Sequence, residues 1–197
     1  MKRSNSKKKD QIVFLLFCLV LGMLMGWISK DLAGSGVIGA IISNIGIWVF
    51  VSSLIAVYSP EAVRAALHVF VYFVGVIGAY YAHLFALGMN MTGNVLYWLV
   101  FAAIGALIGF IVWHSGDKEW LGAGCAAVPI SLLLAEGYPI YHSLSISLGF
   151  DIVCAVLLYI LLAPSKNQKL MMLPYIIVFT FGLVYFGVFT RIFGGWI

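Results

Sequence analysis

The stretch Ser143–Ile160, SLSISLGFDIVCAVLLYI, decides the fold, because it is apolar over the length of a bilayer crossing and carries one charged residue. A membrane-spanning helix needs about 20 apolar residues. Asp151 lies near the middle of this stretch, where an ionised carboxylate costs roughly 3 kcal/mol on insertion scales. A chain that keeps such a residue usually gives it a hydrogen-bond partner, a proton or a ligand. The stretch therefore predicts a transmembrane helix with a polar site at Asp151.

The composition of the whole chain agrees with a membrane protein. Of its 197 residues, 63% are hydrophobic and 9% are charged, and the mean hydropathy is +1.09, whereas soluble domains contain about 25% charged residues. Five of the eleven basic residues lie in the first nine positions, a pattern typical of an orientation signal rather than of a nucleic-acid surface. We predict a basic cytoplasmic tail at residues 1–10, a single transmembrane helical domain at residues 11–197, and no nucleic-acid partner.

Charged residues, glycines and prolines divide the chain into seven apolar segments. Their predicted bounds are 11–29, 37–58, 61–87, 95–113, 120–136, 143–163 and 170–193. The sequence thus predicts an all-α, polytopic transmembrane helix bundle of about seven helices, or six if the first or the last does not span. The first segment also fits a signal peptide, but its apolar part is long and no clear cleavage site follows, which favours a retained anchor.

The distribution of basic residues predicts the orientation. With alternating sides, nine basic residues fall on the side of the N-terminal tail and two, Lys30 and Arg191, fall on the other. Because basic residues concentrate on the cytoplasmic side, we predict a multi-pass protein of the cell's inner (plasma) membrane with its N-terminus in the cytoplasm and its C-terminus outside. If the last segment only enters the interface, the C-terminus returns to the inside.

Polar side chains gather in one layer near the predicted outer side. A rise of 1.5 Å per residue places Asn44, Tyr80, Tyr81 and Asp151 roughly 10 to 12 Å below the outer surface. Helical spacing puts Ser147 on the same face as Asp151. The candidate ligand-binding or proton-linked residues are Asp151, Asn44, Trp48, Tyr80, Tyr81, His83, Ser147, Glu136 and His142.

Two interpretations of this polar layer remain open. In the first, an outward-facing polar cavity centred on Asp151 binds or transports a small polar or cationic ligand, or passes protons, because ionisable residues inside a membrane default to a functional hypothesis. In the second, the layer is a dry interhelical hydrogen-bond network in a structural or regulatory membrane subunit. Such bonds average only ~0.6 kcal/mol in a measured case. The expected partners are the lipid bilayer, such a ligand, and a membrane protein or further copies of the chain.

Sequence patterns of common enzymes are missing. The chain has no H-E-x-x-H, G-x-S-x-G or phosphate-binding G-x-x-x-x-G-K-[ST] pattern, so we expect no enzyme, no catalytic residue and no cofactor, a membrane enzyme without a recognisable motif being the exception. Cys18, Cys125 and Cys154 lie in apolar runs without acids or histidines at metal spacing. We therefore expect packing thiols and no metal site.

Small residues recur four positions apart at Gly22 and Gly26, at Gly75 and Ala79, and at Gly105 and Gly109. This spacing allows two helix backbones to approach closely. It predicts tight helix packing but does not separate packing within one chain from assembly of several chains.

The run 43–50, SNIGIWVF, followed by YSP at 58–60, RAALHVF at 64–70 and AYY at 79–81, resembles an uncharacterised family of small multi-pass bacterial membrane proteins. The likeness covers the second to sixth segments and implies a bacterial inner-membrane location without an activity. In size the chain is also similar to the substrate-capturing membrane subunits of energy-coupling-factor vitamin transporters. Those proteins usually have six helices and an Ala-x-x-x-Ala docking pattern, where the first segment here has Gly22-x-x-x-Gly26.

Overall fold

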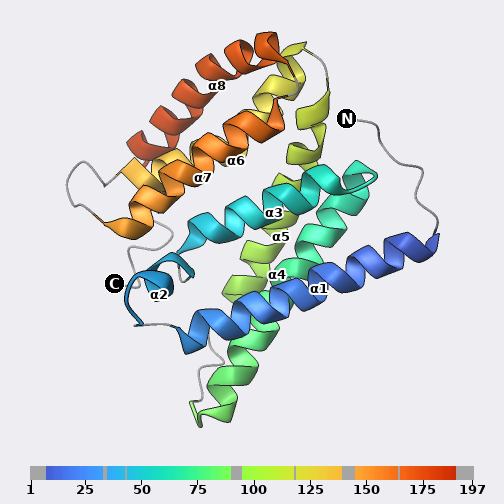
Figure 1. Ribbon diagram of the computed structural model, residues 1–197, viewed down its shortest axis with the longest axis vertical. Helices are drawn as coiled ribbons and strands as arrows, with labels where there is room; N and C mark the ends of the chain where they lie inside the picture. The colour runs from blue at the N-terminus through green and yellow to red at the C-terminus, as the bar shows by residue number, and fades with distance from the viewer. Residues whose placement is uncertain are drawn as a thin grey trace. The chain divides into compact units, whose positions relative to one another are not determined.

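The computed structural model describes residues 8–32, 35–42, 44–89, 95–117, 119–138, 145–163 and 165–189. Within these ranges the chain is helical and has no strand, which confirms the predicted all-α helix bundle (Figure 1). The elements are α1 (Lys8–Asp31), α2 (Gly36–Ile42), α3 (Ile45–Tyr58), α4 (Ala62–Ala86), α5 (Val95–Trp113), the short 3-10 helix η2 (His114–Gly116), α6 (Glu119–Gly137), α7 (Ile146–Leu162) and α8 (Lys166–Tyr185).

Several of these helices are long and apolar enough to cross a bilayer. Among the described residues, α1, α4, α5 with η2, α6 and α8 meet that requirement, and α2 with α3 adds a sixth span if the two form one broken segment. The remaining apolar helix, α7, has 17 residues. By length and composition the chain is therefore a multi-pass membrane protein, and each of the seven predicted segments contains helix.

Several helix boundaries differ from those predicted, α8 for example ending at Tyr185 and not near residue 193, and two of the differences have a local cause. The second segment is divided into α2, which ends at Ile42, and α3, which begins at Ile45. Asn44 precedes α3, and its side-chain Oδ1 accepts a hydrogen bond of 2.9 Å from the Ile45 backbone N–H. The last helix begins at Lys166 rather than at Leu170, because Ser165 Oγ accepts a hydrogen bond of 3.2 Å from the Gln168 N–H. Both residue types are preferred helix N-caps, since they satisfy backbone donors that a helix leaves open at its start.

The chain divides into two compact units. The N-terminal unit comprises residues 1–43 and 52–113, and the C-terminal unit comprises residues 44–51 and 114–197. That the two act as a single transmembrane domain stays a prediction, and the proposed basic tail lies mostly outside the described residues.

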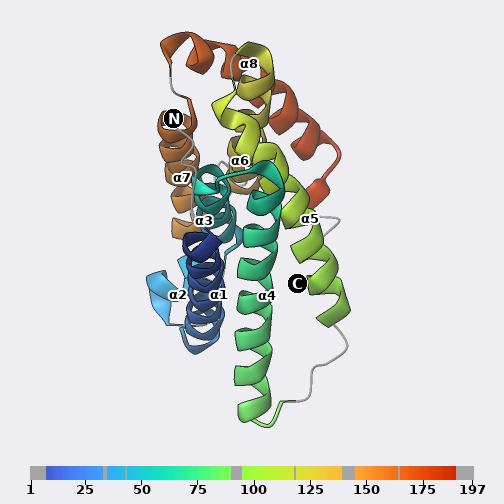
Figure 2. The ribbon, with the colours of Figure 1, turned by 90° about the vertical axis from the view of Figure 1, so that its right-hand side faces the viewer.

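Glycines bring the helices of the N-terminal unit close together. Helix α4 packs against both α1 and α5, and Figure 2 shows α4 running beside α1. A Cβ atom on Gly22 would overlap the Tyr72 carbonyl oxygen, and one on Gly26 would overlap the Val76 carbonyl oxygen. Where α5 packs on α4, a Cβ on Gly105 would lie 2.6 Å from the Phe73 ring. These small residues therefore pack helices within one chain.

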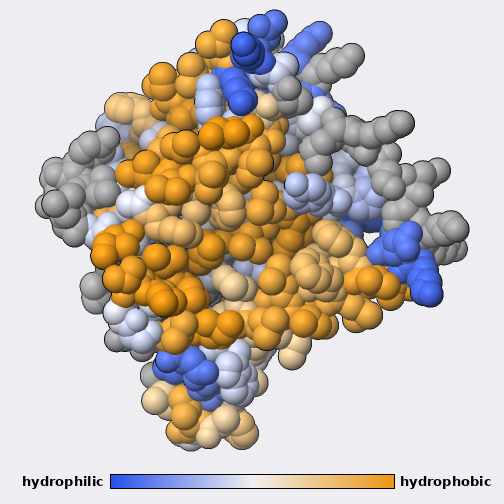
Figure 3. Space-filling view, viewed as in Figure 1, coloured by the Kyte–Doolittle hydropathy of each residue, from blue (hydrophilic) through white to orange (hydrophobic). Residues whose placement is uncertain are grey.

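The outer face of α1 is apolar. Its exposed side chains include Ile12, Leu16, Val20 and Leu24, each more than half exposed. Figure 3 shows this helix as a hydrophobic band with hydrophilic residues at its two ends. Such a band matches a surface in contact with lipid, where a soluble protein would carry charges.

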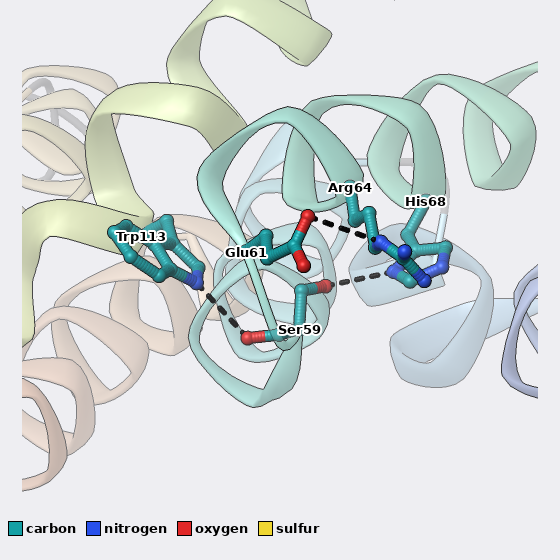
Figure 4. Close-up of polar contacts among 5 residues, drawn as sticks. All are labelled: Ser59, Glu61, Arg64, His68 and Trp113. Atoms are coloured by element: carbon teal, nitrogen blue, oxygen red, sulfur yellow. Dashed lines mark hydrogen bonds and ion pairs between the residues drawn. The ribbon is translucent and has the colours of Figure 1, made fainter. Parts of the chain in front are cut away.

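A polar cluster, here called the α3–α4 turn cluster, joins Ser59, His68 and Trp113 (Figure 4). Ser59 Oγ donates a hydrogen bond of 2.7 Å to the Ile55 carbonyl and lies 2.9 Å from His68 Nδ1. Trp113 Nε1 donates to the Ser59 carbonyl over 3.0 Å. Ser59 and His68 are both buried. The cluster thus satisfies buried polar groups where the chain turns from α3 into α4 and where α5 ends.

We expect Ser59→Ala to lower the free energy of unfolding by about 1 to 2 kcal/mol, because it leaves the buried His68 ring nitrogen without its partner. The midpoint of unfolding in mixtures of mild detergent and sodium dodecyl sulfate measures this loss. Ser35→Ala is the matched control: Ser35 Oγ also donates to a carbonyl one helical turn back, over 2.7 Å to Leu32, but it is exposed. A loss equal to that of the control would contradict the prediction.

The C-terminal unit is built around α6, which packs against both α7 and α8. Ten of its residues are buried, Leu133 and Pro129 among them, and Leu158 of α7 and Met172 of α8 are buried as well. At the start of α6, Gln168 Nε2 donates hydrogen bonds of 2.8 and 3.2 Å to the Ser115 and Asp117 carbonyls. A buried amide thereby fixes α8 to the segment that precedes α6.

Candidate functional site

Asp151 lies in the middle of α7 and has no exposed surface. Its Oδ2 accepts a hydrogen bond of 2.8 Å from Asn44 Nδ2. Its Oδ1 is buried and has no hydrogen-bond partner. Buried polar atoms are nearly always paired, so an orphaned carboxylate oxygen requires an explanation such as a proton, an ion or a ligand. The sequence prediction that Asn44 and Asp151 lie together is thus matched by the geometry of the C-terminal unit.

Two glycines make room for the Asp151 side chain. A Cβ on Gly46, in the first turn of α3, would overlap Asp151 Oδ1. A Cβ on Gly137, the last residue of α6, would lie 3.6 Å from Asp151 Cβ and 3.1 Å from the Leu148 carbonyl oxygen. The carboxyl group is therefore enclosed by the start of α3 and the end of α6. The start of a helix carries a partial positive charge and open backbone N–H groups, which suits an anionic oxygen.

Glu136 brings a second carboxyl group to the end of α6, next to Gly137, where an added Cβ would lie 3.6 Å from Asp151 Cβ. It is the penultimate residue of α6 and lies within electrostatic reach of Asp151 and of the Ile45 backbone N–H. Its Oε2 is buried and has no hydrogen-bond partner. We call Asn44, Glu136 and Asp151 the acidic site. It contains two carboxyl groups, one amide donor and two unpartnered carboxyl oxygens.

The described part of the C-terminal unit contains two further candidate residues, Trp48 and Ser147. Trp48 lies one turn further along α3 and is half-buried. Ser147, one turn before Asp151 on α7, is 2.8 Å from Ser145 through their hydroxyl oxygens. His142, another candidate from the sequence, lies outside the described residues.

Tyr80, Tyr81 and His83 belong to α4 in the N-terminal unit. The two tyrosine rings are half-buried and meet edge to face, with centroids 5.7 Å apart. His83 Nε2 lies 3.3 Å from Asp31 Oδ1 at the end of α1, and its ring is 4.4 Å from that of Trp27. Within this unit, His83 therefore joins the C-terminal ends of α1 and α4. That the three α4 residues share a cavity with Asp151 stays a prediction.

Two residues of the site were missed from the sequence, Gly46 and Gly137. Gly46 follows Asn44 by two positions inside an apolar run. An asparagine followed by an apolar helical pattern is an N-cap signal, and it predicts the break before α3. Nothing in the local sequence indicates that Gly137 faces Asp151, because that contact depends on how α6 and α7 pack.

No protein-family model, no curated protein and no solved structure matches this chain. Among the described residues, no group of three or more histidine, cysteine, aspartate or glutamate side chains is arranged to hold a metal ion. Proposals for function therefore depend on the geometry of the acidic site alone.

Proposed function

We propose that this membrane protein binds or transports a small polar or cationic solute, and that the acidic site is its binding or coupling site. The observation that carries the proposal is the state of Asp151: its side chain is fully buried, yet one carboxyl oxygen has no partner. A helix-locking residue would be expected to have both oxygens satisfied, as buried polar groups generally do. An outward-facing cavity that leads to this site, in a bacterial inner membrane, completes the proposal.

A positively charged solute suits the acidic site on electrostatic grounds. The end of α6, which carries Glu136, contacts α7 beside Asp151, and among the described residues neither carboxyl group forms an ion pair with a basic side chain. A cation that reaches the site would be attracted to both carboxyl groups, and such attraction is strong away from water.

A second function, from another class, is a structural or regulatory membrane subunit. The hydrogen bond of 2.8 Å from Asn44 and the tight fit of Gly46 favour it, because both hold Asp151 in place without any ligand. In that case the acidic site only joins α3, α6 and α7, and a stable protein partner is expected to co-purify with the chain.

We expect Asp151→Asn to abolish stabilisation by small organic cations while leaving the protein folded, because the amide keeps the shape of the carboxyl but lacks its charge. The probes are methylammonium, choline and guanidinium, and the measurement is the shift in melting temperature of the full chain in nanodiscs. Native mass spectrometry of the same samples detects a co-purified small molecule.

Glu119→Gln serves as the control for loss of an acidic charge, since Glu119 is exposed at the other end of α6. This variant should keep every cation effect of the unaltered protein. An equal shift in Asp151→Asn would contradict solute binding at the acidic site. If no probe stabilises the unaltered protein and no small molecule is bound, the structural subunit is the better explanation.

A further inference from the structure

The two carboxyl groups of the acidic site would repel each other if both were ionised, and no basic side chain among the described residues pairs with either of them. If both were ionised, two negative charges would lie near each other where the end of α6 packs on α7 beside Asp151, which is strongly unfavourable away from water. Asn44 supplies one donor, to Asp151 Oδ2. Asp151 Oδ1 and Glu136 Oε2 remain buried without a partner.

A single bound proton would both reduce the repulsion and supply a hydrogen-bond donor. It would remove one of the two negative charges. A protonated carboxyl also carries an O–H donor that an ionised one lacks, so it can satisfy an oxygen that otherwise has no partner. Paired carboxyl groups that share one proton behave as a coupled unit rather than as two separate acids.

The arrangement suits a proton better than a metal cation. A hard cation such as Na⁺ or Mg²⁺ needs several converging oxygen ligands. Here Asn44 presents its NH₂ group to Asp151, and its own oxygen already accepts from the Ile45 N–H. The described side chain in contact with Asp151 Oδ2 therefore presents a donor and not a further oxygen ligand.

The other titratable groups near the pair can be named element by element. On α7, Cys154 lies within electrostatic reach of Asp151. On α6 the facing group is Glu136 itself, and the described start of α3 contributes Asn44 and backbone groups but no titratable side chain. A response of this site to pH is thus expected to come from the two carboxyl groups.

We propose that Asp151 and Glu136 together bind one exchangeable proton, and that this proton is the ion that drives or gates transport. The second half of this statement rests on the proposed function; the first half does not. The proton comes from water and returns to water, and its uptake changes the charge of the pair from two negative charges to one.

Infrared difference spectroscopy of the full chain in nanodiscs tests the proton directly, because the C=O stretch of a protonated carboxyl is separate from the bands of carboxylates. In the unaltered protein we expect a protonated carboxyl at neutral pH that is lost in alkali. In Glu136→Gln and in Asp151→Asn the remaining carboxyl should lose its proton at lower pH, with proton binding about tenfold weaker or more, since the repelling neighbour is gone. Glu119→Gln should titrate like the unaltered protein.

Two results would overturn the shared proton. One is the absence of a protonated carboxyl at neutral pH, or a titration that neither variant changes. The other is a rise in melting temperature with sodium chloride but not with choline chloride at equal ionic strength, lost in Asp151→Asn, which would identify a metal cation as the occupant. If Asp151→Asn does not fold, Glu136→Gln decides alone, because it keeps the hydrogen bond between Asn44 and Asp151.

The two experiments distinguish the shared proton from the solute site. If the carboxyl titrates as expected but organic cations do not change the melting temperature, the shared proton is supported and the solute site is contradicted. Stabilisation by an organic cation that depends on Asp151, with no protonated carboxyl, leaves the solute site and removes the shared proton.

Discussion

Gly26→Leu is expected to unfold the N-terminal unit or to lower its free energy of unfolding by about 3 kcal/mol or more. A Cβ at position 26 would overlap the Val76 carbonyl oxygen and would also come within 2.9 Å of the Val76 Cα atom. Overfilled cores usually cost about 1 to 3 kcal/mol, because side chains can move aside. Here the obstacle is helix backbone, so α1 and α4 must separate. Unfolding in detergent and the yield of folded protein measure the effect.

Gly78→Leu is the matched control for this prediction. Gly78 lies on α4 itself, and an added Cβ there meets no atom within 4 Å. Since leucine favours helix over glycine by roughly 1 kcal/mol, this control should be neutral or stabilising. Equal melting temperatures of Gly26→Leu and Gly78→Leu would contradict the close packing of α1 on α4. A change in oligomeric state in Gly26→Leu without loss of stability would instead assign these glycines to contacts between chains.

The fold class was predictable because it depends on patterns that are local in the sequence. Apolar runs of spanning length, separated by charges and prolines, require helices in a bilayer. The break before α3 was missed because Asn44 was assigned to the polar layer of an unbroken helix. The same asparagine is a helix N-cap, and an N-cap within an apolar run is a boundary.

The acidic site was predictable in part. Counting residues from the helix ends placed Asn44 and Asp151 at a common depth, and the side chains are 2.8 Å apart. Depth does not specify rotation about the helix axis or which helices are neighbours. For that reason the sequence alone neither paired Glu136 with Asp151 nor identified the glycines that enclose the carboxyl group. Those contacts follow from the packing of α6 on α7.

Gly46→Ala is expected to displace the Asp151 carboxyl group and to lower the free energy of unfolding by about 3 kcal/mol. The new methyl group would overlap Asp151 Oδ1, and Leu133 Cδ2, 3.4 Å from the same position, limits escape on one side. Moving the carboxyl also breaks the bond from Asn44, because both oxygens belong to one rigid group. The expected cost combines overpacking with a lost buried hydrogen bond, and unfolding in detergent measures it.

A double-mutant cycle separates this mechanism from a general effect of substitution in α3. In an Asp151→Ala background the obstructing oxygen is absent, so Gly46→Ala should cost at least about 1 kcal/mol less than it does in the unaltered chain, which is the signature of residues in direct contact. Gly182→Ala, on α8 where an added Cβ meets no atom within 4 Å, should be neutral in both backgrounds. Additive losses would place Asp151 away from the start of α3. Coupled losses would place the Asp151 carboxyl group against the start of α3, beside Asn44, which is the arrangement that both the solute site and the shared proton require.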